Sequence, residues 1–251
     1  MSRYARMFVW IAGIAALGAG VLVQQAARAA ETPEKKVKVL LVTGGEIHDW
    51  KGVGQAVQET LEKYGRFDVT KVENDLGAFQ AERLKPYDMV VFYWTLGTLT
   101  PEQKQGITEF VKGGKGFVTF HSGADSFRGD KDWHDFVGGH FVGHPAYRPY
   151  PVTIVDKAHP ILKGVDGFTI TDEQYYLDYN KDKIKVLATG PGPREGAEPM
   201  PAIWVQPLGQ GRIFYMGFGH DAKAARDANF QKILPRATLW AAGAESLEAR
   251  P

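Results

Sequence analysis

The sequence has no cysteine among its 251 residues, which excludes disulfide bonds, a lipid-modified cysteine and any thiol nucleophile. It also has no excess of charge of either sign, because 30 Lys and Arg residues stand against 29 Asp and Glu residues. Proteins that bind nucleic acid usually carry a basic surface. We therefore expect no nucleic-acid partner.

Two familiar glycine motifs are incomplete. Gly44 and Gly45 follow a predicted strand without the G-x-G-x-x-G pattern, so no nucleotide cofactor is expected, although their N–H groups could bind an oxyanion. Ser122 lies in FHSG, where Phe120 replaces the first glycine of the G-x-S-x-G elbow. The match to a serine-hydrolase elbow is therefore partial.

The first 30 residues have the pattern of a Sec-type signal peptide. Arg3 and Arg6 precede an uncharged apolar run over residues 7–23, and Ala27 and Ala29 fit an A-x-A cleavage site. The alternative is a retained anchor, because the run is near the lower length limit for a spanning helix. We expect a periplasmic or secreted protein without stable membrane association once the signal is removed.

The pattern of apolar residues predicts an α/β fold. Near-continuous apolar runs, typical of strands buried on both faces, alternate with segments of helical periodicity. The expected strands are 37–43, 67–73, 87–94 and 114–120, and the expected helices are 52–65 and 100–114. This order favours a mostly parallel sheet with helices on both faces, in three layers. Shorter β-like runs follow at 151–155, 168–176, 183–189, 202–206 and 212–218, before a final helix over 221–243 that should bend or break near Pro235.

Three histidines occupy equivalent places in this pattern. His48, His121 and His220 each follow a predicted strand within a few residues, and Glu173, within the β-like run 168–176, could reach the same edge. The carboxyl ends of parallel strands meet at one edge of a sheet, where ligands bind in such folds. We therefore expect these side chains to converge, the alternative for each being a hydrogen-bonded structural role.

Two mechanisms fit these residues. In the first, His48, His121 and His220, with Glu173, hold a zinc-like divalent ion whose open position polarises a substrate oxygen or acidifies a water. In the second, Ser122 is the nucleophile and His220 the base, oriented by Asp221 or Glu173. His134 and His159 are expected to be surface, packing or turn residues. His140 and His144 are four apart, a spacing that could place both on one helix face as metal ligands, but the flanking glycines and Pro145 argue for a loop.

Aromatic residues accompany the same turns. Trp50, Trp94, Phe127 and Tyr175 could stack on the apolar faces of sugar rings, while carboxylates such as Asp125 bind the hydroxyl groups. This mixture favours a carbohydrate substrate, although aromatic residues at strand ends also serve the core.

Taken in order, six motifs resemble the trehalose-utilisation (ThuA-like) family over residues 36–243. They are VLLVTGGEIHDW, YDMVVFYWT, GFVTFHSGADSF, GGHFVGHP, TDEQYY and GRIFYMGFGHD. The resemblance implies a flavodoxin-like sheet similar to that of class I glutamine amidotransferases. In those enzymes a cysteine occupies the elbow and a later histidine completes the catalytic pair. Here the elbow is His121-Ser122 and the later histidine matches His220, so glutamine amidotransfer is excluded by the lack of cysteine.

The resemblance also implies a role in disaccharide and keto-sugar metabolism. A keto group would acidify the neighbouring C–H bonds, so that a histidine base could remove a proton. We expect a metal-assisted hydrolase, lyase or isomerase acting on a disaccharide, glycoside or 3-keto-sugar derivative. A serine hydrolase using Ser122 and a non-catalytic sugar-binding protein are the alternatives, and the chain could form a homo-oligomer.

Overall fold

The computed structural model describes residues 35–249. The predicted signal peptide, residues 1–30, lies outside the described residues. Within the described part, no helix is both long enough and apolar enough to cross a membrane.

A nine-stranded sheet forms the centre of the molecule, in the order β2-β1-β3-β4-β11-β10-β9-β6-β7. The first five strands in this order are parallel, and each later strand is antiparallel to its neighbour, so that only β10 and β6 point the opposite way. The small strands β5 and β8 pair separately. The strands are β1 (Val37–Gly45), β2 (Phe67–Glu73), β3 (Met89–Thr95), β4 (Gly116–Phe120), β5 (Gly139–Gly143), β6 (Arg148–Ile154), β7 (Phe168–Asp172), β8 (Tyr176–Tyr179), β9 (Lys185–Gly190), β10 (Met200–Leu208) and β11 (Gly211–Met216).

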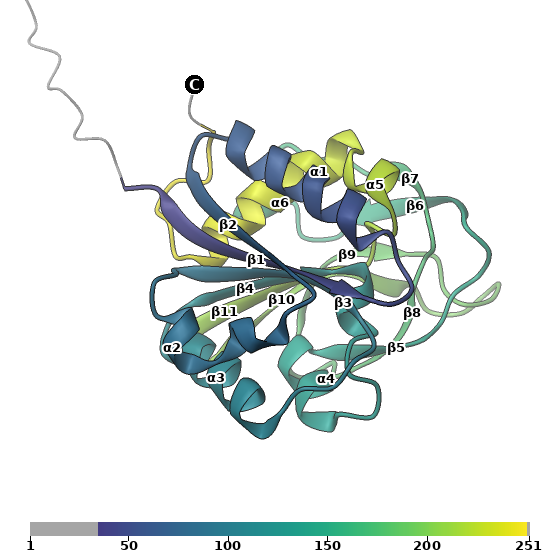
Figure 1. Cartoon of the computed structure of the whole chain (residues 1–251). Helices are drawn as coiled ribbons and strands as arrows, with labels where there is room; N and C mark the ends of the chain where they lie inside the picture. Colours follow the sequence, from purple (N-terminus) through teal and green to yellow (C-terminus); the bar gives the residue numbers. More distant parts are fainter. Residues whose placement is uncertain (1–34, 250–251) are drawn as a thin grey trace, which may run out of the picture. The chain divides into compact units, whose positions relative to one another are not determined.

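Helices cover both faces of this sheet (Figure 1). Helices α1, α5 and α6 lie on one face, and α2, α3 and α4 lie on the other. Two apolar clusters fill the space between the layers, one under each set of helices. The helices are α1 (Trp50–Lys63), α2 (Ala81–Leu84), α3 (Pro101–Lys112), α4 (Lys131–Val137), α5 (Ala222–Ala225) and α6 (Ala228–Ala241). The predicted three-layer α/β fold is confirmed.

Local sequence explains the main elements. Every residue of β3 and of β4 is buried, as their near-continuous apolar runs predict. Helix α1 buries Val53, Val57 and Leu61 on one face. Helix α3 begins at a capping box in which the Thr100 and Gln103 side chains satisfy each other's backbone N–H groups.

Two details differ from the prediction. The sequence pattern missed α2 and the preceding 3-10 turn, Leu76–Phe79, which are too short to show helical periodicity. The final helix was predicted to bend or break near Pro235; it does not break there, because Pro235 lies inside α6 and the break falls at Asp227. The Asp227 carboxylate accepts hydrogen bonds from the first N–H groups of α6, which fixes the start of the helix. Beyond it, the completely buried Ile233 and Leu234 hold the helix against the core around the proline.

Candidate metal centre

The carboxyl ends of four co-directed strands bring together a cluster of three histidines and one glutamate. His48 follows β1, His121 follows β4 directly, Glu173 follows β7 and His220 follows β11. One potential ligand atom from each of these residues lies within 4.8 Å of the others. The predicted convergence of these side chains is confirmed.

The three imidazole rings are arranged almost symmetrically. The ring centroids are 5.0 Å apart for His48 and His121, 4.9 Å for His48 and His220, and 5.1 Å for His121 and His220. Each pair meets at between 81° and 88°. One nitrogen of each ring lies within 4.8 Å of the ligand atoms of the other cluster residues, so the rings direct nitrogens into a shared space.

The distances between ligand atoms suit one small ion. His220 Nδ1 is 3.0 Å from Glu173 Oε2 and 3.2 Å from His121 Nε2, and the latter two atoms are 3.9 Å apart. Zinc binds imidazole nitrogen and carboxylate oxygen at about 2.0–2.2 Å, so neighbouring ligand atoms of a tetrahedral site are about 3.3–3.6 Å apart. The cluster thus fits a metal of this size.

Hydrogen bonds to the other ring nitrogens select the metal-facing atoms. His48 Nδ1 lies 2.6 Å from Thr95 Oγ1, at the end of β3, which leaves Nε2 for the cluster. His121 Nδ1 lies 3.5 Å from the Gly217 carbonyl and 3.7 Å from Asp172 Oδ1. Partners of this kind orient ligand histidines in metal sites generally.

The backbone of the cluster is also held in place. His121 adopts φ of +40°, a left-handed conformation that a residue with a side chain keeps only when its surroundings fix it. Tyr215 donates a hydrogen bond to the His121 carbonyl at 3.0 Å, and Tyr93 donates one to the His220 carbonyl at 2.8 Å. The two histidines are therefore positioned by buried tyrosines of β11 and β3.

Burial keeps the imidazoles of His48 and His121 neutral. Loss of solvent, with the neighbouring His220 as second cause, lowers the pKa of His48 to about 4. Burial likewise lowers the pKa of the fully buried His121 well below its usual range. Neutral imidazole is the form that binds metals, so both residues are ready to bind at neutral pH.

A buried aspartate lies beneath the cluster. Asp172 accepts hydrogen bonds from the backbone N–H groups of Glu173, Gly219 and His220. Burial raises its pKa to about 7, although these hydrogen bonds act in the opposite direction. Asp172 thereby joins the ends of β7 and β11 and holds Glu173 and His220 in place.

The expected sugar-binding residues do not all lie at the histidine cluster. Tyr175 lies in the site, with its ring 4.0 Å from that of His121 and its hydroxyl 3.5 Å from His48 Nε2. Trp94 and Phe127 are buried in the core on the α3 side, and Asp125 is paired with Arg128 at 2.6 Å. Trp50, at the start of α1, packs partly against the other apolar cluster. Of these five residues, only Tyr175 contacts the histidine cluster.

The residues of the serine alternative do not assemble into a triad. Ser122 is completely buried, and its hydroxyl makes no hydrogen bond to a histidine within residues 35–249. Asp221 caps α5 through Ala224 N and accepts a hydrogen bond from Tyr147. His220 contacts Glu173 at 3.0 Å, a pair that either mechanism could use, but the serine hydroxyl is missing from it.

Sequence reasoning missed four residues around the cluster: Thr95, His144, Tyr147 and Asp172. His144 Nδ1 lies 3.8 Å from Glu173 Oε1, and the Tyr147 ring lies 5.6 Å from that of His220. His140 does not accompany His144 but stacks on His134 at 4.1 Å. The acidic pair in TDEQYY could have indicated Asp172, whereas the positions of His144 and Tyr147 depend on a connection whose course no local pattern predicts.

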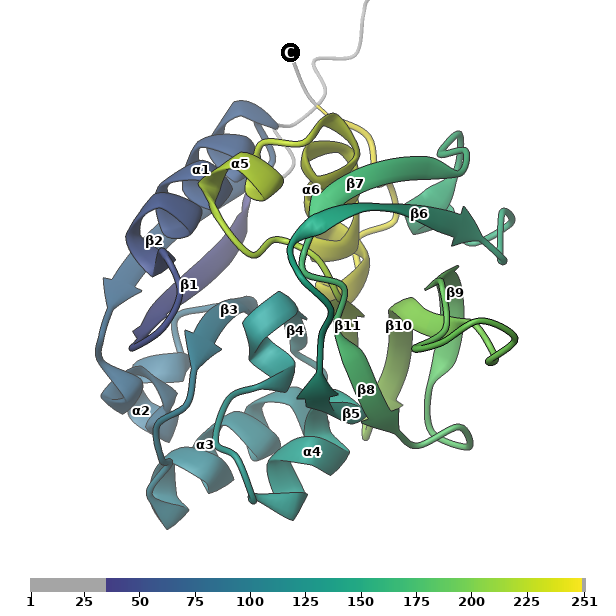
Figure 2. The same cartoon turned by 90° about the vertical axis from the view of Figure 1, so that its right-hand side faces the viewer.

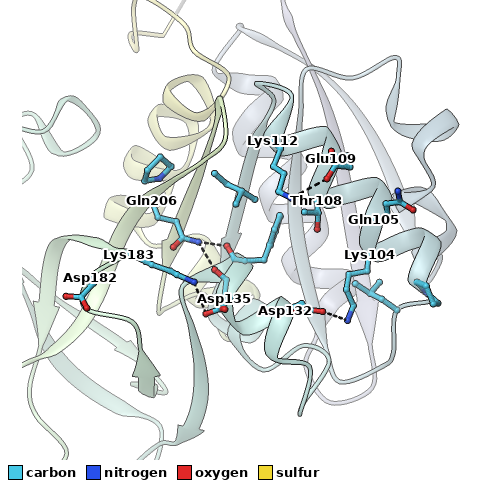
Figure 3. Close-up of a pocket in the computed structure, with 15 residues that line it drawn as sticks. Lys104, Gln105, Thr108, Glu109, Lys112, Asp132, Asp135, Asp182, Lys183 and Gln206 are labelled. Atoms are coloured by element: carbon cyan, nitrogen blue, oxygen red, sulfur yellow. Dashed lines mark hydrogen bonds and ion pairs between the residues drawn. The ribbon is translucent and has the colours of Figure 1, made fainter.

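A separate groove of about 890 Å³ lies between α3, α4 and the end of β10 (Figure 3). Most of its charged side chains pair with one another: Lys104 with Asp132, Lys112 with Glu109, and Lys183 with Asp135. None of the four cluster residues lines it. Because these charges are already paired, the groove gives no chemical indication of a ligand.

The fold and the cluster define an α/β protein with a histidine and glutamate site at the carboxyl edge of a flavodoxin-like sheet. The sequence profile of the ThuA family, described as trehalose utilisation, matches residues 38–241. The chain belongs to this family, which points to carbohydrate metabolism. No curated protein matches the chain.

Solved structures share the fold. A ThuA-like protein from Parabacteroides merdae is 24% identical, with a TM-score of 0.75 over 86% of this chain and 92% of that one. A ThuA-like protein from Bacteroides uniformis is 20% identical, with a TM-score of 0.69 over 85% and 94% of the two chains. A β-galactosidase from Bacillus circulans matches over 84% of this chain but only 32% of its own, at 13% identity and a TM-score of 0.60.

Proposed function

We propose that the protein is a metal-assisted enzyme that acts on a disaccharide, glycoside or 3-keto-sugar derivative, as a hydrolase, lyase or isomerase. The observation that carries this proposal is the convergence of His48, His121, Glu173 and His220 within 4.8 Å. Three imidazole nitrogens and one carboxylate suit zinc and similar divalent ions. The family description, trehalose utilisation, supports a sugar as the substrate.

The cluster is accessible from one side, as a catalytic site must be. His121 is completely buried, whereas the His220 and Glu173 side chains are 26% and 18% exposed. A substrate would therefore approach from the side of His220 and Glu173, with His121 and Tyr175 behind it. A divalent ion held here would act as a Lewis acid on a substrate oxygen.

The protein groups would supply positioning and proton transfer. The carboxylate of Glu173 or an imidazole not engaged as a ligand would accept the proton from a carbon next to a keto group. Asp172 would hold Glu173 and His220 in place through its backbone hydrogen bonds. The Tyr175 ring, packed on His121, would exclude water from the buried side of the cluster.

Metal content and turnover measured together test this proposal. We expect one equivalent of zinc or a similar ion in the purified protein, and little in His121→Ala. His159→Ala is the matched control, because His159 packs beside Trp240 and is not one of the cluster residues. Turnover of 3-keto-trehalose or another 3-keto-glucoside should disappear on chelation and return with metal.

The two alternatives give different results in the same experiment. A serine hydrolase would be labelled by a fluorophosphonate at Ser122 and would be indifferent to chelators. A non-catalytic sugar-binding protein would keep its ligand affinity when His121 and His220 are both replaced by alanine. Either result would contradict the metal-assisted enzyme.

We also propose export to the periplasm or the cell exterior. The support is the sequence of residues 1–30 alone.

A further inference from the structure

The connection from β5 to β6 forms the outer side of the candidate metal centre. Figure 2 shows it running from the small β5-β8 sheet up to β6. Two of its side chains reach the cluster, His144 toward Glu173 and Tyr147 toward His220. We refer to His144 and Tyr147 as the outer wall.

We propose that this outer wall selects a neutral pyranose ring as the substrate of the site. The inference rests on the proposed function and adds to it the side chains that recognise the sugar ring. Tyr147 would provide the stacking face, and His144 would bind a hydroxyl of the same ring.

The Tyr147 ring is both exposed and held in a fixed position. Its side chain is among the few large hydrophobic ones left exposed in the described part of the chain, at 37%. Its hydroxyl donates a hydrogen bond to Asp221 Oδ2 at 3.3 Å, and Asp221 is itself fixed as the cap of α5. The ring is therefore held beside His220 while part of it stays open to solvent, which suits stacking against the C–H face of a sugar.

His144 is prepared to accept a hydrogen bond. Its Nδ1 lies 2.8 Å from the Pro145 carbonyl, which can only accept, so Nδ1 carries the proton in this contact. In the neutral ring Nε2 is then an acceptor. Within residues 35–249 it has no hydrogen-bond partner, and the side chain is 36% exposed. A sugar hydroxyl is a suitable donor for it.

The side chains around the outer wall offer no basic group to a phosphorylated ligand. No lysine or arginine in the described part of the chain makes a hydrogen bond, ion pair or ring contact with the cluster or the outer wall. The nearest acidic partners are the carboxyl groups of Glu173, Asp172 and Asp221. Arg128 is occupied by both carboxylate oxygens of Asp125. A phosphate held at the outer wall, away from the ion, would therefore lack the arginine or lysine contacts that usually bind it.

Titration calorimetry on the zinc-loaded protein tests the inference, with trehalose and methyl α-glucopyranoside as neutral probes and trehalose 6-phosphate as the charged one. We expect trehalose 6-phosphate to bind at least tenfold more weakly than trehalose. Tyr147→Ala should weaken trehalose binding about tenfold, as loss of one stacked aromatic contact implies, with zinc content unchanged. Tyr147→Phe, which keeps the ring, should stay within about threefold of the wild type. Tyr179→Ala, on β8, is the control.

The outcomes separate this inference from the proposed function. Failure of the wild type to bind zinc would refute the proposed function. The inference alone is overturned if the zinc-loaded wild type binds neither neutral probe, or binds trehalose 6-phosphate as tightly as trehalose. It is also overturned if Tyr147→Ala binds trehalose as tightly as the wild type does.

Discussion

Replacing Thr95 by valine should weaken metal binding without disturbing the fold. Thr95 is completely buried, and valine has nearly the same shape, so the substitution leaves no cavity. Its hydroxyl oxygen lies 2.6 Å from His48 Nδ1, the contact that fixes the ring and leaves Nε2 for the metal. Thr95→Val removes this orienting group and leaves a buried N–H without a partner.

The expected loss is about 10–100-fold in zinc affinity, or about 1.4–2.7 kcal/mol, the range found for partners of ligand histidines. A competition titration against a chromophoric chelator at pH 7.5 measures it. Thr238→Val is the matched control, because Thr238 is equally buried and its hydroxyl donates to Leu234 O within α6. Equal zinc affinities for wild type and Thr95→Val would refute the reasoning, since His48 would then not need this tautomer to bind the metal.

Three further predictions concern stability. Zinc at about 1,000 times its Kd should stabilise the protein by about 4 kcal/mol and raise Tm by about 8–16 °C in a calorimetric scan, whereas a shift below 2 °C would argue against a specific site. Because His48 has a pKa of about 4 when folded and about 6.5 when unfolded, the unfolded chain binds the extra proton between these values. The metal-free protein should therefore lose up to about 3 kcal/mol between pH 6.5 and pH 4 relative to His48→Gln in urea titrations, and parallel pH curves would contradict this. Gly123→Ala should lower the free energy of unfolding by about 3 kcal/mol or more, because the new Cβ would lie 1.8 Å from Thr119 Oγ1. Gly143→Ala should be nearly neutral, because nothing lies within 4 Å of its Cβ position. Similar urea midpoints for the two variants would show that the close approach is absent.

Much of the architecture could be predicted because the relevant signals are local. The apolar runs that become β1, β3 and β4 are nearly continuous, since these strands are covered on both faces. The order of strands and helices then implied parallel strands with a common carboxyl edge. The places of His48, His121 and His220 followed from that edge alone.

The remainder of the site depends on long-range packing. Asp172 acts through backbone groups of Gly219 and His220, which are more than forty positions away in the sequence. Trp94 and Phe127 lie at or after the ends of predicted strands, yet they turn into the core. No local pattern distinguishes an aromatic side chain that faces the core from one that faces a ligand. The start of α6 was missed because an aspartate cap, rather than the proline, sets the boundary.

The most direct test of a metal centre is anomalous X-ray diffraction at the zinc absorption edge from a crystal of the protein grown with zinc. The account predicts one strong peak among His48 Nε2, His121 Nε2, His220 Nδ1 and a Glu173 carboxylate oxygen, at about 2.0–2.2 Å from the atoms that bind it. A zinc-soaked crystal with no peak between these four side chains, or with peaks only at surface histidines, would contradict it.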